Sequence, residues 1–220
     1  MISWPTTIKE ATEIQGKFAR LVRLHSLEQP LRTVCGVDAA YCDGEIIAVA
    51  TLFDFATLTP RAEASAVVAT PFPYVPGYLS FREGPAILTA VARLPLLPDL
   101  ILVDGQGIAH PRGLGIASLL GVLFDRPAIG CAKTRLIGEY AEPAANRGSW
   151  SPLLLEGATV GAALRTRSGV KPLFVSAGHR ITLPEAIDIV LHCSGRYRLP
   201  EPQRAADQLA GRIKRQLLAA

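Results

Sequence analysis

Apolar positions in the first third of the chain change from a helical to a strand-like spacing. Residues 6–10, TTIKE, have the spacing of a helix capping box, and apolar residues then recur every three or four positions as far as Leu24. Three strand-like runs follow, at 33–41, 46–55 and 62–69. The pair Asp43-Gly44 between the first two runs is typical of a tight hairpin. These patterns predict an amphipathic helix that covers a sheet face, followed by an antiparallel meander.

Shorter and mostly apolar runs follow in the rest of the chain, and the most uniform of them are typical of strands buried on both faces. We expect strands at 100–103, 128–132, 153–155, 159–164 and 173–175. Helical patterns lie at 81–94, 115–124, 182–193 and from 201 to the end. Hairpins that lead into strand–helix–strand units predict an α/β fold, in which a mixed central sheet carries helices on both faces. Because no linker or repeat divides the chain, residues 1–220 are expected to form one domain.

Composition agrees with one sizeable core, because apolar residues make up 49% of the chain. The formal net charge of +4 permits a polyanionic partner without requiring one. Basic residues gather near the C-terminus, at Arg196, Arg198, Arg204, Arg212, Lys214 and Arg215. This cluster has two interpretations, a solvated helical face or a surface that faces phosphate groups.

The cysteines and the N-terminus indicate the compartment. Cys35, Cys42, Cys131 and Cys193 form no C-x-x-C pair and have no histidine at zinc-finger spacing, which favours a reduced intracellular protein without structural zinc. The N-terminus lacks the apolar region of a signal peptide, and no window reaches the roughly 18 apolar residues of a membrane span. We therefore expect a cytoplasmic protein with no membrane partner.

Three acidic residues occupy positions that suggest chemistry. Asp38 lies in the apolar run VCGVDAAY, where an unpaired carboxylate would be costly. Asp104 follows the run LILV, at the edge where open α/β sheets place ligands. Glu83 begins a helix directly after a proline-rich stretch. If strands 33–41 and 100–103 are neighbours, these carboxylates can converge on a hard cation such as magnesium.

Each acid also has a purely structural interpretation. Glu83 could interact with the helix N-terminus, Asp104 could cap its glycine turn, and Asp38 could be hydrogen-bonded to a neighbouring strand. Considered together on this predicted fold, they favour a metal site.

A glycine-rich turn and a lysine lie close to these acids in the predicted fold. Residues 104–115, DGQGIAHPRGLG, contain four glycines that let the backbone approach a ligand closely. The turn is no dinucleotide fingerprint, because His110 stands where the third glycine would be. His110 could shuttle a proton, contact a phosphate or pack the turn. Lys133 follows the apolar strand AIGCA, and its ammonium could point to solvent or stabilise charge on a phosphate.

Residues 71–78, PFPYVPGY, hold Tyr74 on a stiff loop. Pro71, Pro73 and Pro76 restrict the backbone angles, which makes it easier to order the ring. An ordered aromatic ring beside a phosphate-cutting site could act as a wedge that replaces an unstacked base. Alternatively, the prolines and the tyrosine only pack a turn.

In these segments the sequence resembles the endonuclease V family of deoxyinosine-directed repair nucleases. The blocks GVDAAY, PYVPGYLSFREGP, VDGQGIAHPRGLGIAS, PAIGCAKTRL, GHR and YRLPEPQRAAD occur in the family's order over nearly the whole chain. The resemblance implies a ribonuclease H-like fold and a monomer that needs magnesium, with manganese as a substitute. It also implies hydrolysis of the second phosphodiester bond on the 3′ side of a deoxyinosine in DNA, leaving 3′-hydroxyl and 5′-phosphate ends.

The resemblance also assigns roles to residues. Asp38 and Asp104 match the family's metal-binding aspartates, and Glu83 matches its third acid. Tyr74, with Pro73, matches the wedge. Lys133 matches the lysine near the scissile phosphate, His110 matches the histidine of the D-G-x-G-x-x-H block, and we expect both to be catalytic. A backbone-lined pocket for flipped hypoxanthine would be formed near Gly77, Leu79, Gly105, Ile116 and Leu136. The chain departs from many relatives at Leu119, Ala128 and Cys131, none of which is an implied ligand, so we expect activity to be retained.

Three alternatives stay open at this point. The chain could bind inosine without turnover, or it could be an inosine-specific ribonuclease. It could also be another nuclease of the same fold, such as a junction resolvase, which the stretch around Tyr74 disfavours.

Overall fold

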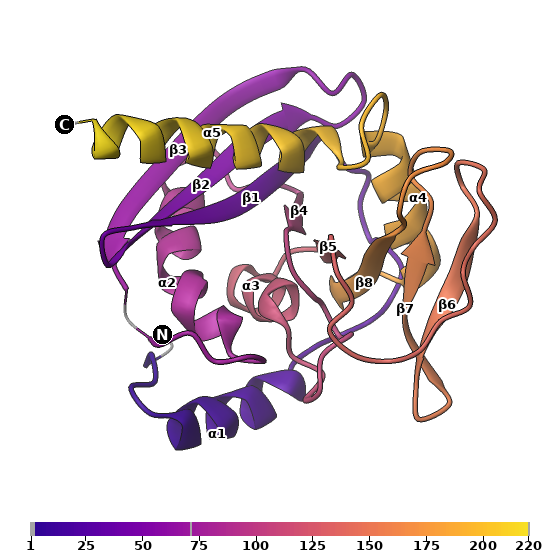
Figure 1. The fold of residues 1–220 in the computed structure, drawn as a ribbon, viewed down its shortest axis with the longest axis horizontal. Helices are drawn as coiled ribbons and strands as arrows, with labels where there is room; N and C mark the ends of the chain where they lie inside the picture. Colours follow the sequence, from indigo (N-terminus) through magenta and orange to yellow (C-terminus); the bar gives the residue numbers. More distant parts are fainter. Residues whose placement is uncertain (1–2, 71, 220) are drawn as a thin grey trace.

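The computed structural model describes residues 3–70 and 72–219, and within them a single mixed sheet runs through the molecule (Figure 1). Its strand order is β3-β2-β1-β4-β5-β8-β7-β6. The strands are β1 (Thr33–Cys42), β2 (Glu45–Asp54), β3 (Pro60–Ala69), β4 (Leu100–Val103), β5 (Ala128–Ala132), β6 (Trp150–Leu155), β7 (Ala158–Leu164) and β8 (Leu173–His179). The helices are α1 (Ile8–Ala19), α2 (Leu79–Ala92), α3 (Ile116–Phe124), α4 (Leu183–Cys193) and α5 (Glu201–Leu218).

The predicted meander is confirmed. β1 and β2 pair antiparallel from Cys42 opposite Glu45 outward, so Asp43-Gly44 is the hairpin turn, and β2 pairs antiparallel with β3. The direction then changes, because β4 lies parallel to β1 on its other side. Parallel neighbours need a crossover, and α2 lies within the connection between β3 and β4. This arrangement brings the carboxyl ends of β1 and β4 to the same sheet edge.

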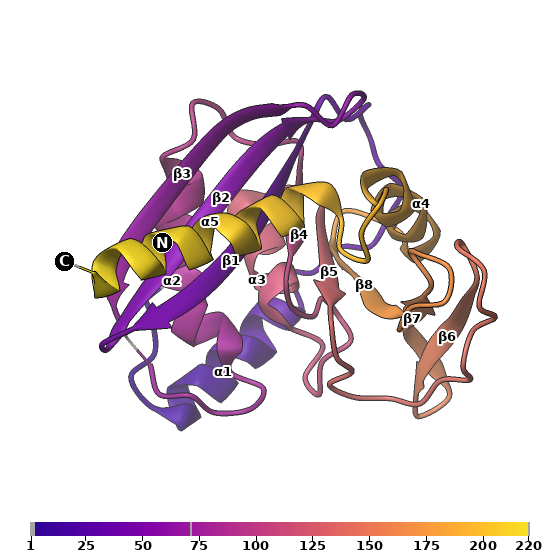
Figure 2. The ribbon, with the colours of Figure 1, turned by 45° about the horizontal axis from the view of Figure 1, so that its top comes forward.

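Helices cover both faces of the sheet, as the pattern predicts. α2 and α3 pack on one face, where Val37, Ile87 and Ile101 belong to one core cluster. α4 and α5 pack on the other face, and α5 runs across β1 and β2 (Figure 2). α1 lies outside the α2 and α3 layer, where Ala11 and Phe81 share a smaller cluster. None of these described helices is long and apolar enough to cross a membrane.

Two helix boundaries differ from the prediction. α1 ends at Ala19 and not near Leu24, because Leu21 and Leu24 continue the apolar spacing but are about half exposed. α2 begins at Leu79, so Glu83 lies beyond its first turn, which contains no acidic residue. The interpretation of Glu83 as a charge at the helix N-terminus is therefore wrong.

Gly36 in β1 packs directly against the start of α5. A Cβ atom at Gly36 would lie 2.2 Å from the backbone carbon and oxygen of Pro202. We expect Gly36→Ala to lower the free energy of unfolding by about 3 kcal/mol, the upper end of the usual cost of overpacking. Urea unfolding measures this change. Gly16→Ala on α1 is the matched control, because a Cβ there meets no atom within 4 Å; equal stability of the two variants would contradict the prediction.

Candidate active site

Asp38 and Asp104 lie on neighbouring strands. The parallel register pairs Val37 of β1 with Val103 of β4, and each aspartate is the next residue of its strand or turn. The condition for convergence of the acids, that strands 33–41 and 100–103 are neighbours, is therefore met. Even-numbered residues of β1, such as Ala40 and Cys42, pack towards α5, so the alternation of the strand turns Asp38 to the same face.

The acids of this region raise one another's affinity for protons. Burial raises the pKa of Asp38 to about 7, and the negative charge of Asp104 adds to the increase. Burial likewise raises the pKa of Glu83 to about 7; a hydrogen bond from Tyr41 opposes this change, and the charges of Asp38 and Asp104 reinforce it. Carboxyls that are both desolvated and mutually repelled favour a cation among them. This donor chemistry fits a hard divalent ion.

The side chains are nevertheless not arranged as a finished metal site. Among the residues that the structure describes, no three His, Cys, Asp or Glu side chains are grouped closely enough to hold an ion together. Two of the carboxylates have other partners: Lys133 Nζ lies 2.7 Å from Asp104 Oδ2, and the Tyr41 hydroxyl donates to Glu83 Oε1. An ion that binds Asp104 through Oδ2 therefore has to displace Lys133.

Lys133 bridges two acids at the end of β5. Its Nζ contacts Asp104 at 2.7 Å and Asp207 Oδ1, on α5, at 3.2 Å. Burial alone would lower the pKa of Lys133, but the two carboxylates outweigh it and raise the pKa, so the side chain is an ammonium. The charge of Asp207 also contributes to the raised pKa of Asp38. Asp207 thus belongs to the same electrostatic cluster.

The segment that leads into α5 fixes the end of β5. Arg198 Nη2 donates to the carbonyl oxygens of Lys133 at 2.8 Å and Pro172 at 2.7 Å. The buried amide of Gln203 donates to the Cys131 carbonyl at 2.9 Å. Since the backbone on both sides of Ala132 is held, the direction of the Lys133 side chain is determined by the fold. Arg198 therefore donates to backbone carbonyl oxygens, unlike a solvated residue of the C-terminal basic cluster.

A cavity of about 440 Å³ opens beside these groups. All five residues predicted for a base pocket line it: Gly77, Leu79, Gly105, Ile116 and Leu136. Four further predicted site residues also line it: Tyr74, Asp104, His110 and Lys133. Asp38, Glu83 and Pro73 are not among its lining residues. Asp104 and Lys133 therefore connect the cavity to the acid cluster.

The proline loop (residues 72–78) presents Tyr74 to solvent at this cavity, with 71% of the residue exposed. The Tyr78 amide donates to the Val75 carbonyl at 3.0 Å, and Gly77 has a φ of +81°. Pro76 followed by a glycine of positive φ is the signature of a type II turn. The first proline of the predicted stretch, Pro71, lies outside the described residues. The loop thus holds an exposed ring next to a closed turn.

His110 connects the glycine-rich turn to this loop. Its Nε2 lies 2.9 Å from the Gly77 carbonyl oxygen, and its Nδ1 accepts from the Arg112 amide at 3.2 Å. Burial lowers the pKa of His110 to about 4, so the ring is neutral and donates through Nε2. With both nitrogens engaged, the geometry favours a positioning role, and the assignment of His110 to catalysis stays a prediction.

Comparison with known proteins decides the family. A family model described as Endonuclease V matches residues 16–208. The chain belongs to the endonuclease V family. An endonuclease V from Geotalea uraniireducens is 57% identical over 96% of this chain and 91% of its own.

Solved structures of the endonuclease V family agree with the fold described above. The crystal structure of endonuclease V from Streptomyces avermitilis has a TM-score of 0.93 and 46% identity, and the match covers 98% of this chain and 96% of that one. A variant endonuclease V from Ciona intestinalis, in complex with a 23mer DNA containing an inosine followed by a ribo-adenosine, has a TM-score of 0.85 and 25% identity, covering 96% and 98% of the two chains. The predicted ribonuclease H-like fold is confirmed.

Sequence reasoning missed Asp207. The residue ends the block YRLPEPQRAAD, but on a helix rich in charge it looks like one more solvated acid. Only the packing of α5 across β1 shows that it meets Lys133. At the three positions of departure from many relatives, Leu119, Ala128 and Cys131 are fully buried and none lines the cavity.

Proposed function

We propose that this chain is a DNA repair endonuclease that recognises deoxyinosine and hydrolyses the second phosphodiester bond on its 3′ side. The observation that carries the proposal is that the acid cluster of Asp38 and Asp104 adjoins a cavity with the exposed Tyr74 at its edge. The inosine-containing DNA bound by the Ciona intestinalis relative supports the same substrate class. We further propose that the enzyme acts in the cytoplasm as a monomer.

Asp38 and Asp104, with Glu83, are the residues that would hold magnesium or, in its place, manganese. When bound, the ion supplies positive charge to the phosphate and lowers the pKa of a water molecule. The raised pKa values of Asp38 and Glu83 indicate that added positive charge would stabilise their ionised forms. Glu83 is buried on α2, on the side where Tyr41 already orients its carboxylate.

Lys133 is placed to stabilise the negative charge that develops on the phosphate. Its ammonium contacts Asp104, and Lys133 also lines the cavity; Arg198 and Gln203 hold the strand end that carries it. A fixed cation aimed at developing charge needs little reorganisation during the reaction. The products would carry 3′-hydroxyl and 5′-phosphate ends, with the leaving 3′ oxygen protonated by water.

The cavity would hold the flipped hypoxanthine. Its volume of about 440 Å³ lies within the usual range of ligand pockets, and Gly77 and Gly105 expose backbone groups along its wall. A backbone-lined pocket can pair the lactam edge of hypoxanthine, whereas adenine would leave a buried donor or acceptor unpaired. Exposed basic residues of α5, such as Arg212 and Arg215, would follow the DNA backbone.

Tyr74→Ala is expected to impair the cutting of inosine in a paired duplex about tenfold, because an aromatic stacking partner is worth roughly 1–3 kcal/mol per base. Cutting of inosine in an unpaired bubble should change by less than about twofold, since that base is already unstacked. Discrimination of inosine from adenine should fall as well. Single-turnover nicking of the substrates measures these effects. Tyr74→Phe is the control that keeps the ring; an unchanged inosine preference in Tyr74→Ala would show that the loop is only scaffolding.

A nicking assay on a duplex with one inosine, in magnesium and in chelator, tests the proposed function. We expect one nick, at the second bond 3′ to the inosine and only with the metal. Binding without any nick would support an inosine-binding module, and cutting restricted to inosine-containing RNA would support a ribonuclease. Preferential cutting of four-way junctions would support a resolvase. Each of these three results would overturn the proposal.

A further inference from the structure

The carbonyl oxygen of Gly77 accepts three hydrogen bonds from two distant parts of the chain. Gln15 Nε2 on α1 donates at 2.8 Å; His110 Nε2 and Arg112 Nη2, from the glycine-rich turn after β4, donate at 2.9 Å each. A carbonyl oxygen has two lone pairs, so three donors are more than it needs. The turn itself is already closed by the Tyr78 amide. These donors therefore fix where the turn lies relative to the rest of the fold.

Gln15 and Arg112 also hold each other. The Gln15 side chain is fully buried, and its Oε1 accepts from Arg112 Nε. An amide buried in this way is costly unless both its ends are paired, and here one end binds the turn and the other binds an arginine that also binds the turn. The Arg112 guanidinium lies 4.3 Å from the centre of the Tyr78 ring. The network encloses the turn from two sides.

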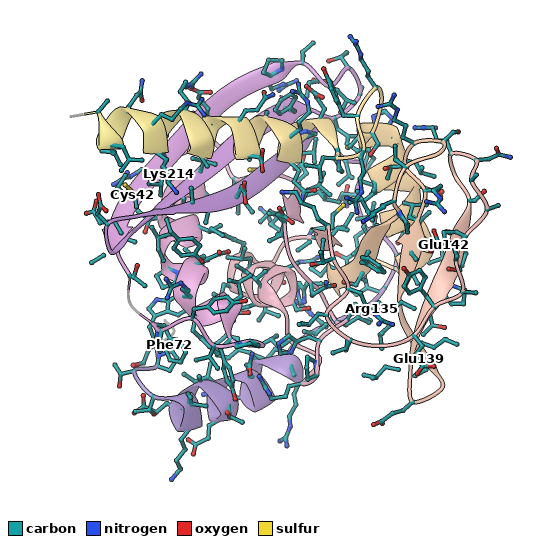
Figure 3. All side chains as sticks on the ribbon, viewed as in Figure 1. Cys42, Phe72, Arg135, Glu139, Glu142 and Lys214 are labelled. Carbon is teal, nitrogen blue, oxygen red and sulfur yellow. The ribbon has the colours of Figure 1, made fainter. Side chains whose placement is uncertain are left out.

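Apolar contacts complete this enclosure. Phe72, at the start of the proline loop, lies between α1 and α2 and packs against Tyr78 and Phe81, with ring centres 6.3 Å and 6.1 Å away (Figure 3). The Tyr78 hydroxyl and Thr12 Oγ1 of α1 share a hydrogen bond of 2.7 Å. Both sides of Tyr74 in the chain are thus anchored to α1, while the Tyr74 residue itself is 71% exposed.

We propose that Gln15, acting with Arg112, is a positioning residue for Tyr74: it locks the Gly77 turn to α1 so that the ring enters the DNA without first being ordered. The inference rests on the proposed function. If the loop had to become ordered on binding, the entropy cost of that ordering would reduce the free energy available to unstack a base.

Two variants test whether the hydrogen bonds of Gln15 to Gly77 and Arg112, called the lock below, hold the turn, and not only the packing of Gln15. Gln15→Met keeps the length of the side chain and removes both hydrogen bonds. Gln15→Glu keeps an acceptor for Arg112 and puts an oxygen where the donor to Gly77 stood. Ser194→Ala is the matched control, because it also removes a buried hydrogen bond from a side chain to a carbonyl oxygen. The Ser194 hydroxyl donates to the Val190 carbonyl at 2.6 Å, at the C-terminal end of α4 and on the other face of the sheet.

The test compares kcat/KM for inosine in a duplex with kcat/KM for inosine in a single strand, at a temperature where melting curves show every variant folded. Both Gln15 variants should lose about tenfold on the duplex, as expected for one lost hydrogen bond to a positioned group. Their single-strand activity should stay within about twofold of the wild type, because an unstacked base needs no wedge. A duplex-to-single-strand ratio equal to that of the wild type and of Ser194→Ala would overturn the lock.

Hydrogen exchange of the Tyr78 amide gives a second readout that needs no activity. The lock predicts faster exchange in both Gln15 variants than in Ser194→Ala, since the turn opens more often. Equal exchange rates would overturn the lock. If the wild type cuts neither inosine substrate, the proposed function fails, and the exchange rates alone then decide whether Gln15 holds the turn.

Discussion

Asp104→Asn is expected to abolish nicking of an inosine-containing duplex. The substitution preserves the shape of the side chain at the carboxyl end of β4 but removes the charge beside Asp38 and Lys133. Losing a preorganised electrostatic group commonly costs about 10²–10³-fold in rate, and Asp104 would serve both the metal and Lys133, so we expect a loss of at least about 10³-fold. Single-turnover nicking in magnesium measures it.

Binding of the same DNA should remain within about threefold of the wild type, because asparagine keeps the shape of the cavity wall at Asp104 and the basic residues of α5 are unchanged. Fluorescence anisotropy in chelator measures this binding without cleavage. Asp188→Asn, at an exposed site on α4, is the control and should nick at the wild-type rate. Full turnover by Asp104→Asn would remove Asp104 from the chemistry.

Lys133→Met is expected to slow nicking by about 10²-fold or more, the usual cost of removing one fixed charge from a transition-state site. The same variant should bind manganese more tightly than the wild type. The reason is that the ammonium now lies 2.7 Å from Asp104 and competes with a cation for that carboxylate. A slower enzyme with higher metal affinity is a combination that simple misfolding would not produce.

Single-turnover nicking and manganese titration measure the two effects of Lys133→Met. Lys171→Met is the control, because Lys171 is exposed in the connection before β8. A nicking rate within about threefold of the wild type would place Lys133 outside the transition state, since charged hydrogen bonds at such sites are worth more than that.

The contact between Lys133 and the acids offsets part of the free-energy cost of burying carboxylates in the free protein. Asp38 and Glu83 are buried among like charges, which is costly without compensation. Lys133 supplies one positive charge to Asp104 and Asp207, and Tyr41 supplies a hydrogen bond to Glu83. A bound ion would replace the contact of Lys133 with Asp104, and the ammonium of Lys133 would then be free to contact the phosphate of the substrate.

Much of the fold could be predicted from the sequence because local patterns determine its elements. Each expected strand and helix has a counterpart in the structure, and the Asp43-Gly44 pair identified the hairpin correctly. Boundaries were less certain where apolar spacing continued onto the surface, as at Leu21 and Leu24. The position of Glu83 within α2 was likewise missed, because a helix start after prolines can shift by a turn without changing the pattern.

The candidate site was predictable only in part, because its geometry depends on contacts far apart in the chain. The convergence of Asp38 and Asp104 was predicted on the condition that their strands are neighbours, and the pairing of β1 with β4 meets that condition. In contrast, the pairing of Lys133 with Asp207 and the bonds of Gln15 to the proline loop arise from helices that pack across long distances in sequence. A buried glutamine on an amphipathic helix has no local signature that separates it from a solvated one.

Anomalous diffraction from crystals soaked in manganese tests the central claim most directly, namely that Asp38, Glu83 and Asp104 close on a divalent ion beside the cavity. We predict a strong peak with carboxylate oxygens of Asp38 and Asp104 among its ligands, Glu83 close by, and Lys133 displaced from Asp104. A well-occupied peak whose ligands include neither aspartate, or no peak at saturating manganese, would contradict the account.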